Sequence, residues 1–125
     1  MEKNSKTISF EFFPSKTDSG KEKLILAAKT FETLSAEYFS VTFGASGSTR
    51  KGTLETCVEL YNSTKTPIAP HISGIGSTKE EIKAILKEYV DLGFKRLFVL
   101  RGDLPSGFGS VGDFRYAIDL INFIK

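Results

Sequence analysis

The sequence repeats one pattern four times, and this repeat limits the folds that are open to it. Each repeat holds a short segment of alternating apolar and polar residues, a loop rich in Gly, Ser or Pro, and a segment whose apolar residues stand three or four positions apart. Alternation is the period of a β-strand, and three-four spacing is that of a helix. A polar residue stands near the end of each predicted strand, about 30 residues after the previous one: Glu11, Thr42, His71 and Asp103. The repeat therefore predicts four βα units in series.

The predicted strands cover residues 7–13, 38–43, 68–73 and 96–100, and a helix follows each of them. Pro70 cannot donate a ladder hydrogen bond, so the third strand is expected to be irregular. Ser77 and Glu80 have the spacing of a capping box at the start of the third helix, and Gly93 is suited to its C-terminal cap. Asp113 is expected to cap the start of the fourth helix.

Four βα units in series indicate an α/β fold with a parallel sheet. Right-handed crossovers bring the carboxyl ends of parallel strands to one face, so the four polar side chains would line one rim. The residue two positions before each of the first three is small, which would leave room there: Ser9, Ser40 and Ala69. Four units are half the number in a (βα)8 TIM-type barrel, and half of such a barrel would expose two strand edges and an open core. The alternative is a small, doubly wound open sheet with helices on both faces.

Composition argues against several functional classes. The 125 residues carry 17 basic and 15 acidic side chains, spread along the sequence, so no nucleic acid partner is expected. The apolar run near the start is too short for a signal peptide or a membrane span, and the single cysteine suits a reducing compartment, so we expect a cytoplasmic protein. Cys57 lies on a predicted apolar helix stripe and is interpreted as a small core residue rather than a reactive thiol. His71 has no second histidine or paired cysteines to form a metal cluster with.

The end of the fourth strand combines opposite charges with a glycine. Residues 100–105 read Leu-Arg-Gly-Asp-Leu-Pro. Gly102 would let a ligand or a neighbouring backbone come close, while Arg101 and Asp103 offer a cation and a carboxylate at one rim. Taken alone, this pattern fits a strand that merely ends in a charged turn equally well.

Four segments together resemble a known family. They read Ser-Phe-Glu-Phe-Phe-Pro at 9–14, Ser-Val-Thr-Phe-Gly-Ala at 40–45, Pro-His-Ile at 70–72 and Leu-Arg-Gly-Asp-Leu-Pro at 100–105. In this order and spacing they closely resemble the N-terminal half of bacterial, flavin-dependent methylenetetrahydrofolate reductase. The resemblance spans essentially the whole chain and implies one partial barrel domain over residues 1–125.

That family reduces 5,10-methylenetetrahydrofolate to 5-methyltetrahydrofolate with NADH or NADPH, through FAD, in one-carbon metabolism and methionine biosynthesis. The resemblance implies an oxidoreductase with FAD as cofactor and with the folate and NAD(P)H as substrates. It also implies a partner, either further copies in a homo-oligomer or a complementary C-terminal half, which in the family supplies much of the remaining site. Two alternatives stay open: a truncated, non-catalytic half barrel or assembly module, and an unrelated phosphate-binding α/β domain.

The resemblance also assigns roles to residues. Glu11 matches the family's general acid, which protonates the folate so that its five-membered ring opens; a carboxyl group among three Phe side chains would be partly desolvated, which favours the protonated form. The simpler alternative is a carboxylate ion-paired within the barrel. Asp103 matches an aspartate beside flavin and folate, where a carboxylate can stabilise a cationic intermediate.

Further positions match flavin contacts of the family. A lone histidine near a strand end is more often a hydrogen-bonded structural group than a catalyst; for His71 the resemblance favours contact with the cofactor over proton transfer. Arg101 is suited to a phosphate or carbonyl partner. The positions that match flavin contacts are Thr42, Phe43, Ala45, His71, Arg101, Gly102, Asp103, Tyr116 and Ala117.

Overall fold

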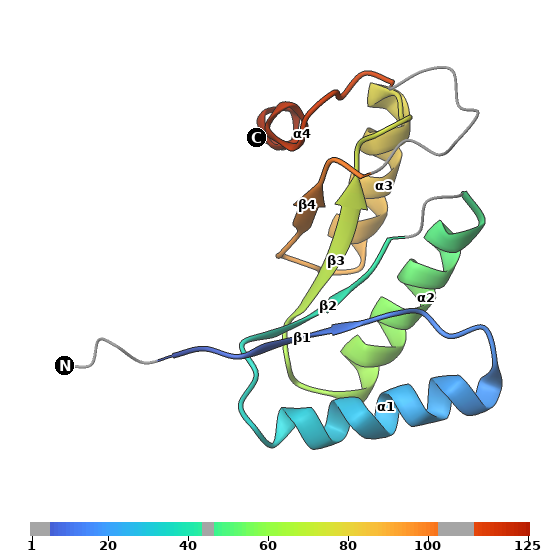
Figure 1. Ribbon diagram of the computed structural model, residues 1–125, viewed down its shortest axis with the longest axis vertical. Coiled ribbons are helices and arrows are strands. Elements are labelled where there is room, and N and C mark those ends of the chain that lie inside the picture. The colour runs from blue at the N-terminus through green and yellow to red at the C-terminus, as the bar shows by residue number, and fades with distance from the viewer. Residues whose placement is uncertain (1–5, 44–46, 103–111) are drawn as a thin grey trace.

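The computed structural model contains four βα units in series (Figure 1). It describes residues 6–43, 47–102 and 112–125. The strands are β1 (Ser9–Phe12), β2 (Tyr38–Val41), β3 (Ile68–Ser73) and β4 (Phe98–Leu100). The helices are α1 (Asp18–Glu32), α2 (Gly47–Ser63), α3 (Lys79–Asp91) and α4 (Ala117–Ile124). The predicted alternation of strands and helices is confirmed; β3 has the predicted bounds, and the other three strands are shorter than expected.

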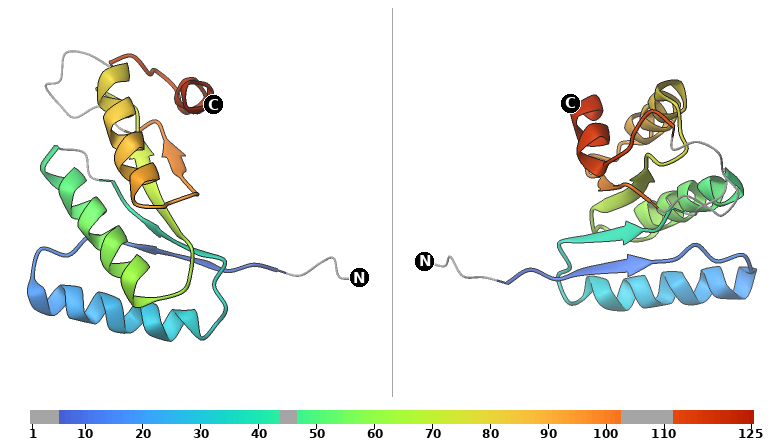
Figure 2. Two further views of the ribbon diagram at one scale, coloured as in Figure 1. Left: turned by 180° about the vertical axis from the view of Figure 1, so that it is seen from behind. Right: turned by 45° about the horizontal axis from the view of Figure 1, so that its top comes forward.

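The strand order decides between the two predicted folds. The four strands are parallel and lie side by side in the order of the sequence, β1-β2-β3-β4. The sheet curves, and the helices follow one side of it (Figure 2). A doubly wound sheet would reorder its strands and carry helices on both faces. The arrangement therefore confirms the barrel interpretation: the described residues form half of a (βα)8 barrel.

The hydrophobic core lies between the sheet and the helices. Phe39 of β2 is completely buried, and its ring meets the ring of Phe12 edge-on at a centroid distance of 5.2 Å. Because successive strand residues point to opposite faces, the residues between these apolar ones point away from the helices. The remaining buried apolar side chains of the strands and helices include Ala28, Val41, Cys57, Leu60, Ile68, Ile72, Ile82, Ile85 and Leu120.

Pro70 does not make β3 irregular, contrary to the prediction. β3 is a continuous strand of 6 residues, in which Pro70 is buried and stands opposite Val41 of β2. In a parallel ladder, alternate residues bond to opposite neighbours, and β4 begins only opposite His71. The missing N–H of Pro70 therefore falls where β4 has not yet begun, and no ladder bond is lost.

The capping box of α3 lies one residue later than predicted. The Thr78 hydroxyl, and not that of Ser77, accepts a hydrogen bond from the Glu81 N–H at 3.2 Å. The Glu81 carboxylate accepts one in return from the Thr78 N–H at 2.9 Å. The segment Ser-Thr-Lys-Glu-Glu offers two overlapping boxes, and the backbone of Ser77 is engaged elsewhere, since its carbonyl accepts a hydrogen bond from the Asp113 N–H at 3.0 Å.

Asp113 is not the N-cap of α4, which begins only at Ala117. Its carboxylate instead accepts a hydrogen bond from the Lys79 N–H at 2.9 Å, in the first turn of α3. It therefore helps to satisfy the free donors of a different helix. The prediction for Gly93 agrees with the structure: it follows the last residues of α3 with a φ of 89°, the left-handed conformation that favours glycine.

Cys57 is a buried core residue of α2, as predicted. Burial raises the pKa of its thiol to about 12. Because the thiolate is the reactive form, its fraction at neutral pH is ~1,000-fold below that of an ordinary cysteine. We expect no reaction of the folded chain with Ellman's reagent. After unfolding in denaturant, we expect one equivalent of protein thiol to react. Rapid labelling of the folded chain would contradict the core assignment.

Candidate functional site

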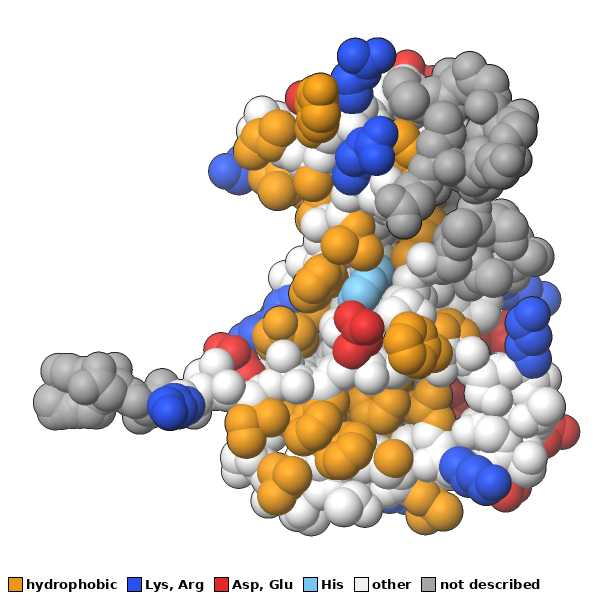
Figure 3. Space-filling model, viewed as in Figure 1, with side chains coloured by type: hydrophobic (Ala, Val, Ile, Leu, Met, Phe, Trp, Pro, Cys, Tyr) orange, Lys and Arg blue, Asp and Glu red, His pale blue; other side chains and the backbone are white. Residues whose placement is uncertain are grey.

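The candidate site lies on the face of the sheet that points away from the helices (Figure 3). Figure 3 looks onto this face and shows the single histidine, in pale blue, among acidic and apolar side chains. No described helix has both the length and the apolar character that a bilayer crossing requires. Residues 6–43, 47–102 and 112–125 hold no group of three or more side chains that could ligate a metal ion.

Glu11 of β1 and His71 of β3 meet on this face across β2. The Nε2 atom of His71 lies 3.3 Å from the Oε1 atom of Glu11. The register explains this, because Glu11 stands opposite Ser40 and Ser40 stands opposite Ala69, two residues before His71. Only small side chains therefore lie between the two polar ones, so that they can approach diagonally across the middle strand.

The two side chains differ strongly in burial. The side chain of His71 is 4% exposed and that of Glu11 47%. The His71 ring stacks on Phe98 of β4, with ring centroids 4.4 Å apart and an interplanar angle of 12°. Burial lowers the pKa of His71, and the Glu11 carboxylate partly opposes this effect. The imidazole is therefore neutral at pH 7, and the pair is not a salt bridge at that pH.

The Nε2 atom of His71 makes no hydrogen bond to any described residue. The approach of Glu11 Oε1 at 3.3 Å is thus close in distance but lacks the alignment of a hydrogen bond. A buried polar atom without a partner is uncommon in folded proteins and calls for an explanation.

Two of the three Phe side chains predicted around Glu11 lie on the opposite face of the sheet. Phe10 and Phe12 point to the helix side of the sheet, where Phe10 stacks on Phe31 with ring centroids 4.0 Å apart. Phe13 is 70% exposed. Alternation along β1 therefore separates Phe10 and Phe12 from the Glu11 carboxyl group, and the Glu11 side chain is half-exposed.

The end of β4 is held by contacts within the chain. The Nε atom of Arg101 donates a hydrogen bond to the carbonyl of Arg115 at 2.9 Å, and a terminal guanidinium nitrogen donates to the carbonyl of Gly102 at 3.3 Å. Gly102 has a φ of 83°, and a Cβ atom there would lie 2.1 Å from the Ser73 Oγ. Only glycine fits this position, because β3 already approaches it closely. Asp103 lies outside the described residues.

The other predicted positions lie at the end of β2 and the start of α4. Thr42 donates its N–H to the carbonyl of Phe12 at 3.0 Å, and its own carbonyl accepts a hydrogen bond from the Thr53 hydroxyl at 2.6 Å. Phe43 packs partly buried against the core. Tyr116, largely exposed, and Ala117 begin α4, which packs against β4. Ala45 lies outside the described residues.

Phe98 was not predicted from the sequence as a site residue. Its ring fixes the His71 imidazole, and it stands opposite His71 in the ladder between β3 and β4. The signal was present: Leu97 and Val99 flank it with an apolar pattern, so Phe98 has to point to the other face.

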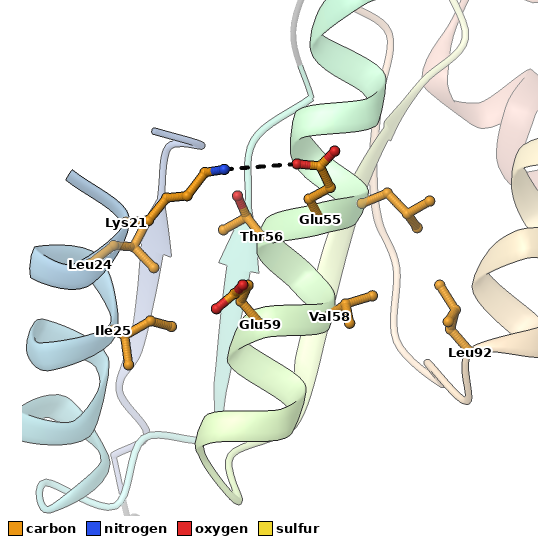
Figure 4. A pocket seen from close by; sticks show the side chains of 9 residues that line it. Lys21, Leu24, Ile25, Glu55, Thr56, Val58, Glu59 and Leu92 are labelled. Atoms are coloured by element: carbon orange, nitrogen blue, oxygen red, sulfur yellow. Dashed lines mark ion pairs between the residues drawn. The ribbon is translucent and has the colours of Figure 1, made fainter. Parts of the chain in front are cut away.

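A separate groove lies on the helix side, between α1 and α2, and has a volume of about 440 Å³. Figure 4 shows Lys21 reaching toward Glu55 across it, with 3.9 Å between the Lys21 Nζ and Glu55 Oε2 atoms. Its apolar lining includes Leu24, Ile25 and Val58. No predicted site residue lines this groove, so it is distinct from the candidate site.

A parallel, singly wound half barrel with polar side chains on its open face defines a protein of the TIM-barrel class. Comparison with known proteins gives the family. The sequence model of the family "Methylenetetrahydrofolate reductase" matches residues 1–125, and the chain belongs to that family.

Individual relatives agree with this assignment. The chain is similar to the 5,10-methylenetetrahydrofolate reductase of Salmonella typhimurium, with 33% identity over 118 residues, which are 94% of this chain and 39% of that protein. The enzyme of the same name from Buchnera aphidicola subsp. Acyrthosiphon pisum is 34% identical over 98% of this chain and 41% of its own length. Methylenetetrahydrofolate reductase (NADH) 1 of Arabidopsis thaliana is 33% identical over 99% of this chain and 22% of its own length. The chain therefore spans about two fifths of the bacterial relatives.

Proposed function

We propose that this chain forms the acid-bearing, FAD-contacting half of a methylenetetrahydrofolate reductase barrel, which reduces 5,10-methylenetetrahydrofolate with NAD(P)H. Membership of the family supports the reaction. The observation that carries the proposal for this chain is the meeting of Glu11 and His71 on the open face of the sheet. Residues 1–125 would act as one partial barrel domain.

Glu11 is proposed as the general acid. Its side chain is 47% exposed on the open face, so a ligand bound there can reach the carboxyl oxygen. A general acid has to lie within hydrogen-bond reach of the atom that it protonates. In this proposal the proton of the Glu11 carboxyl group passes to a nitrogen of the folate, and the carbon–nitrogen bond of the five-membered ring then breaks.

FAD is the proposed cofactor, and it would supply the transfer of hydride from NAD(P)H to the folate. The buried Nε2 atom of His71, which has no hydrogen-bond partner among the described residues, is proposed as a contact for a polar group of that ligand. Gly102 is proposed as a further contact at the end of β4. The remaining proposed contacts are Thr42, Phe43, Ala45, Arg101, Asp103, Tyr116 and Ala117, and Asp103 is also proposed to stabilise a cationic folate intermediate.

A partner is proposed to complete the barrel. In the described part of the chain β1 pairs only with β2, and β4 only with β3, so each has a free edge of N–H and C=O groups. Apolar side chains next to these edges are exposed, including Ile8, Phe13 and Phe98. We propose a complementary C-terminal half as the partner, with homo-oligomers as the alternative. A non-catalytic half barrel or assembly module remains the second candidate function, since the free edges favour assembly with or without catalysis.

Flavin binding tests both candidates. The barrel completed with its C-terminal half is expected to be yellow, to bind FAD stoichiometrically, and to oxidise NAD(P)H with a quinone acceptor. A colourless barrel that takes up no flavin would refute the reductase proposal. FAD titration of the 125-residue chain alone, followed by flavin fluorescence, completes the test: tight stoichiometric binding would argue against the non-catalytic module.

A further inference from the structure

The buried nitrogen of His71 and the exposed carboxyl group of Glu11 lie side by side without a formed hydrogen bond. The two atoms are 3.3 Å apart, and Nε2 has no hydrogen-bond partner among the described residues. An aligned hydrogen bond between nitrogen and oxygen has a typical length of about 2.9 Å. A small movement of one side chain would therefore complete the bond.

Glu11 is the side chain free to make that movement. The His71 ring is held against Phe98 in a stacked arrangement, and the backbone of His71 is fixed because its carbonyl accepts a hydrogen bond from the Tyr89 hydroxyl at 3.2 Å. The Glu11 side chain is half-exposed and rotates about three bonds. The ring thus provides a fixed point, and the carboxyl group adjusts to it.

The described side chains that surround His71 are uncharged, except for Glu11. Phe98 on β4 and the small side chains of Ser40 and Ala69 carry no charge, and the Tyr89 hydroxyl of α3 bonds to the backbone. Among the described residues, Glu11 is the charged group that influences the imidazole. Protonation of the His71 imidazole therefore depends on Glu11.

We propose that His71 is a positioning residue for Glu11: the stacked imidazole orients the carboxyl group on the open face, and the two side chains share one exchangeable proton. When Glu11 carries the proton, its O–H donates to Nε2 of the neutral imidazole. When Glu11 gives this proton to an acceptor, a carboxylate remains beside the neutral ring, and solvent returns a proton to the pair. The assignment deepens the proposed function, because it rests on Glu11 as the acid, and it adds a role for His71 besides contact with the cofactor.

The test is an NMR titration of the His71 ring. His71 is the only histidine of the 125 residues, so its ring signals need no further assignment. We expect a titration midpoint below the ordinary value of 6.5, because burial lowers the pKa of His71. Glu11→Gln is expected to lower the midpoint further, since it removes the carboxylate that favours the imidazolium. In a longer protein with more histidines, His71→Gln identifies the signal by its loss.

Glu55→Gln is the matched control. Glu55 is an exposed carboxylate of α2 whose ion pairs are with Lys21 and Lys51, so its loss is expected to leave the His71 midpoint unchanged. Equal midpoints in the unchanged chain and in Glu11→Gln would overturn the proposal, and so would an equal shift in Glu55→Gln. The ring nitrogen shifts of the unchanged chain give a second test: the tautomer with its proton on Nδ1, which leaves Nε2 free to accept from the Glu11 O–H, supports the pairing. The other tautomer, or the mixture seen for a free imidazole, contradicts it.

These readouts separate the pairing from the reductase proposal. They need no flavin, folate or nicotinamide. If Glu11→Gln leaves the titration midpoint of His71 unchanged, the proposed pairing is refuted, whether or not the barrel binds FAD. If the completed barrel binds no flavin, the reductase proposal is refuted, but a measured pairing of Glu11 and His71 still stands.

Discussion

Glu11→Gln is expected to lower the rate of folate reduction by the complete barrel by about 10²–10⁴-fold. Glutamine has nearly the same size as glutamate but carries no acidic proton, so ring opening of the folate would lose its acid. Glu11 is half-exposed and lies apart from the buried core, so the substitution is expected to leave the fold unchanged. The measurement is steady-state reduction of 5,10-methylenetetrahydrofolate by NAD(P)H.

The quinone reaction provides the internal control for this prediction. Oxidation of NAD(P)H by a quinone does not need the folate to be protonated, so Glu11→Gln is expected to retain it. Glu55→Gln, which removes a carboxylate on the helix side of the sheet, is expected to retain both reactions. A Glu11→Gln variant that still reduces the folate at the rate of the unchanged protein would show that Glu11 is not the acid.

The fold could be predicted from the sequence because its repeat reflects burial directly. The alternation of Phe39 and Val41 with small polar residues marks a strand with one covered face, and the structure buries both apolar side chains. Local signals were less reliable where tertiary contacts decide between equivalent residues. Ser77 and Thr78 can both cap α3, and the contact of Ser77 with Asp113, 36 positions further on, leaves Thr78 as the cap.

The sequence predicted which residues lie together in the candidate site, but not how deeply each of them is buried. Parallel register brings Glu11 and His71 to one face, so their proximity follows from the repeat. The sequence did not reveal that His71 is buried while Glu11 is half-exposed. That difference depends on neighbouring strands: Phe98 of β4 covers His71, whereas β1, which carries Glu11, pairs with one strand only in the described part of the chain. Exposure at the edge of a half barrel is a property of the assembly and not of a local pattern.

Phe39→Ala is expected to destabilise the 125-residue chain by about 3–5 kcal/mol. Phe39 lies on β2, between two paired neighbours, and is completely buried. Its ring packs edge-on against Phe12 and against Phe10, with centroid distances of 5.2 and 6.3 Å. Because the free energy of unfolding of a whole domain is only about 5–15 kcal/mol, the loss would remove a large part of it. The measurement is urea denaturation followed by circular dichroism.

Leu26→Ala serves as the matched control for Phe39→Ala. Leu26 lies on α1 and is 66% exposed, so its truncation removes an apolar side chain without opening a cavity. The expected change in the free energy of unfolding is within about 0.5 kcal/mol, as for most surface substitutions. Equal stability of the two variants would mean that Phe39 is not buried between sheet and helices in solution. A large loss for Phe39→Ala alone would show that the core of this half barrel forms without the rest of the barrel.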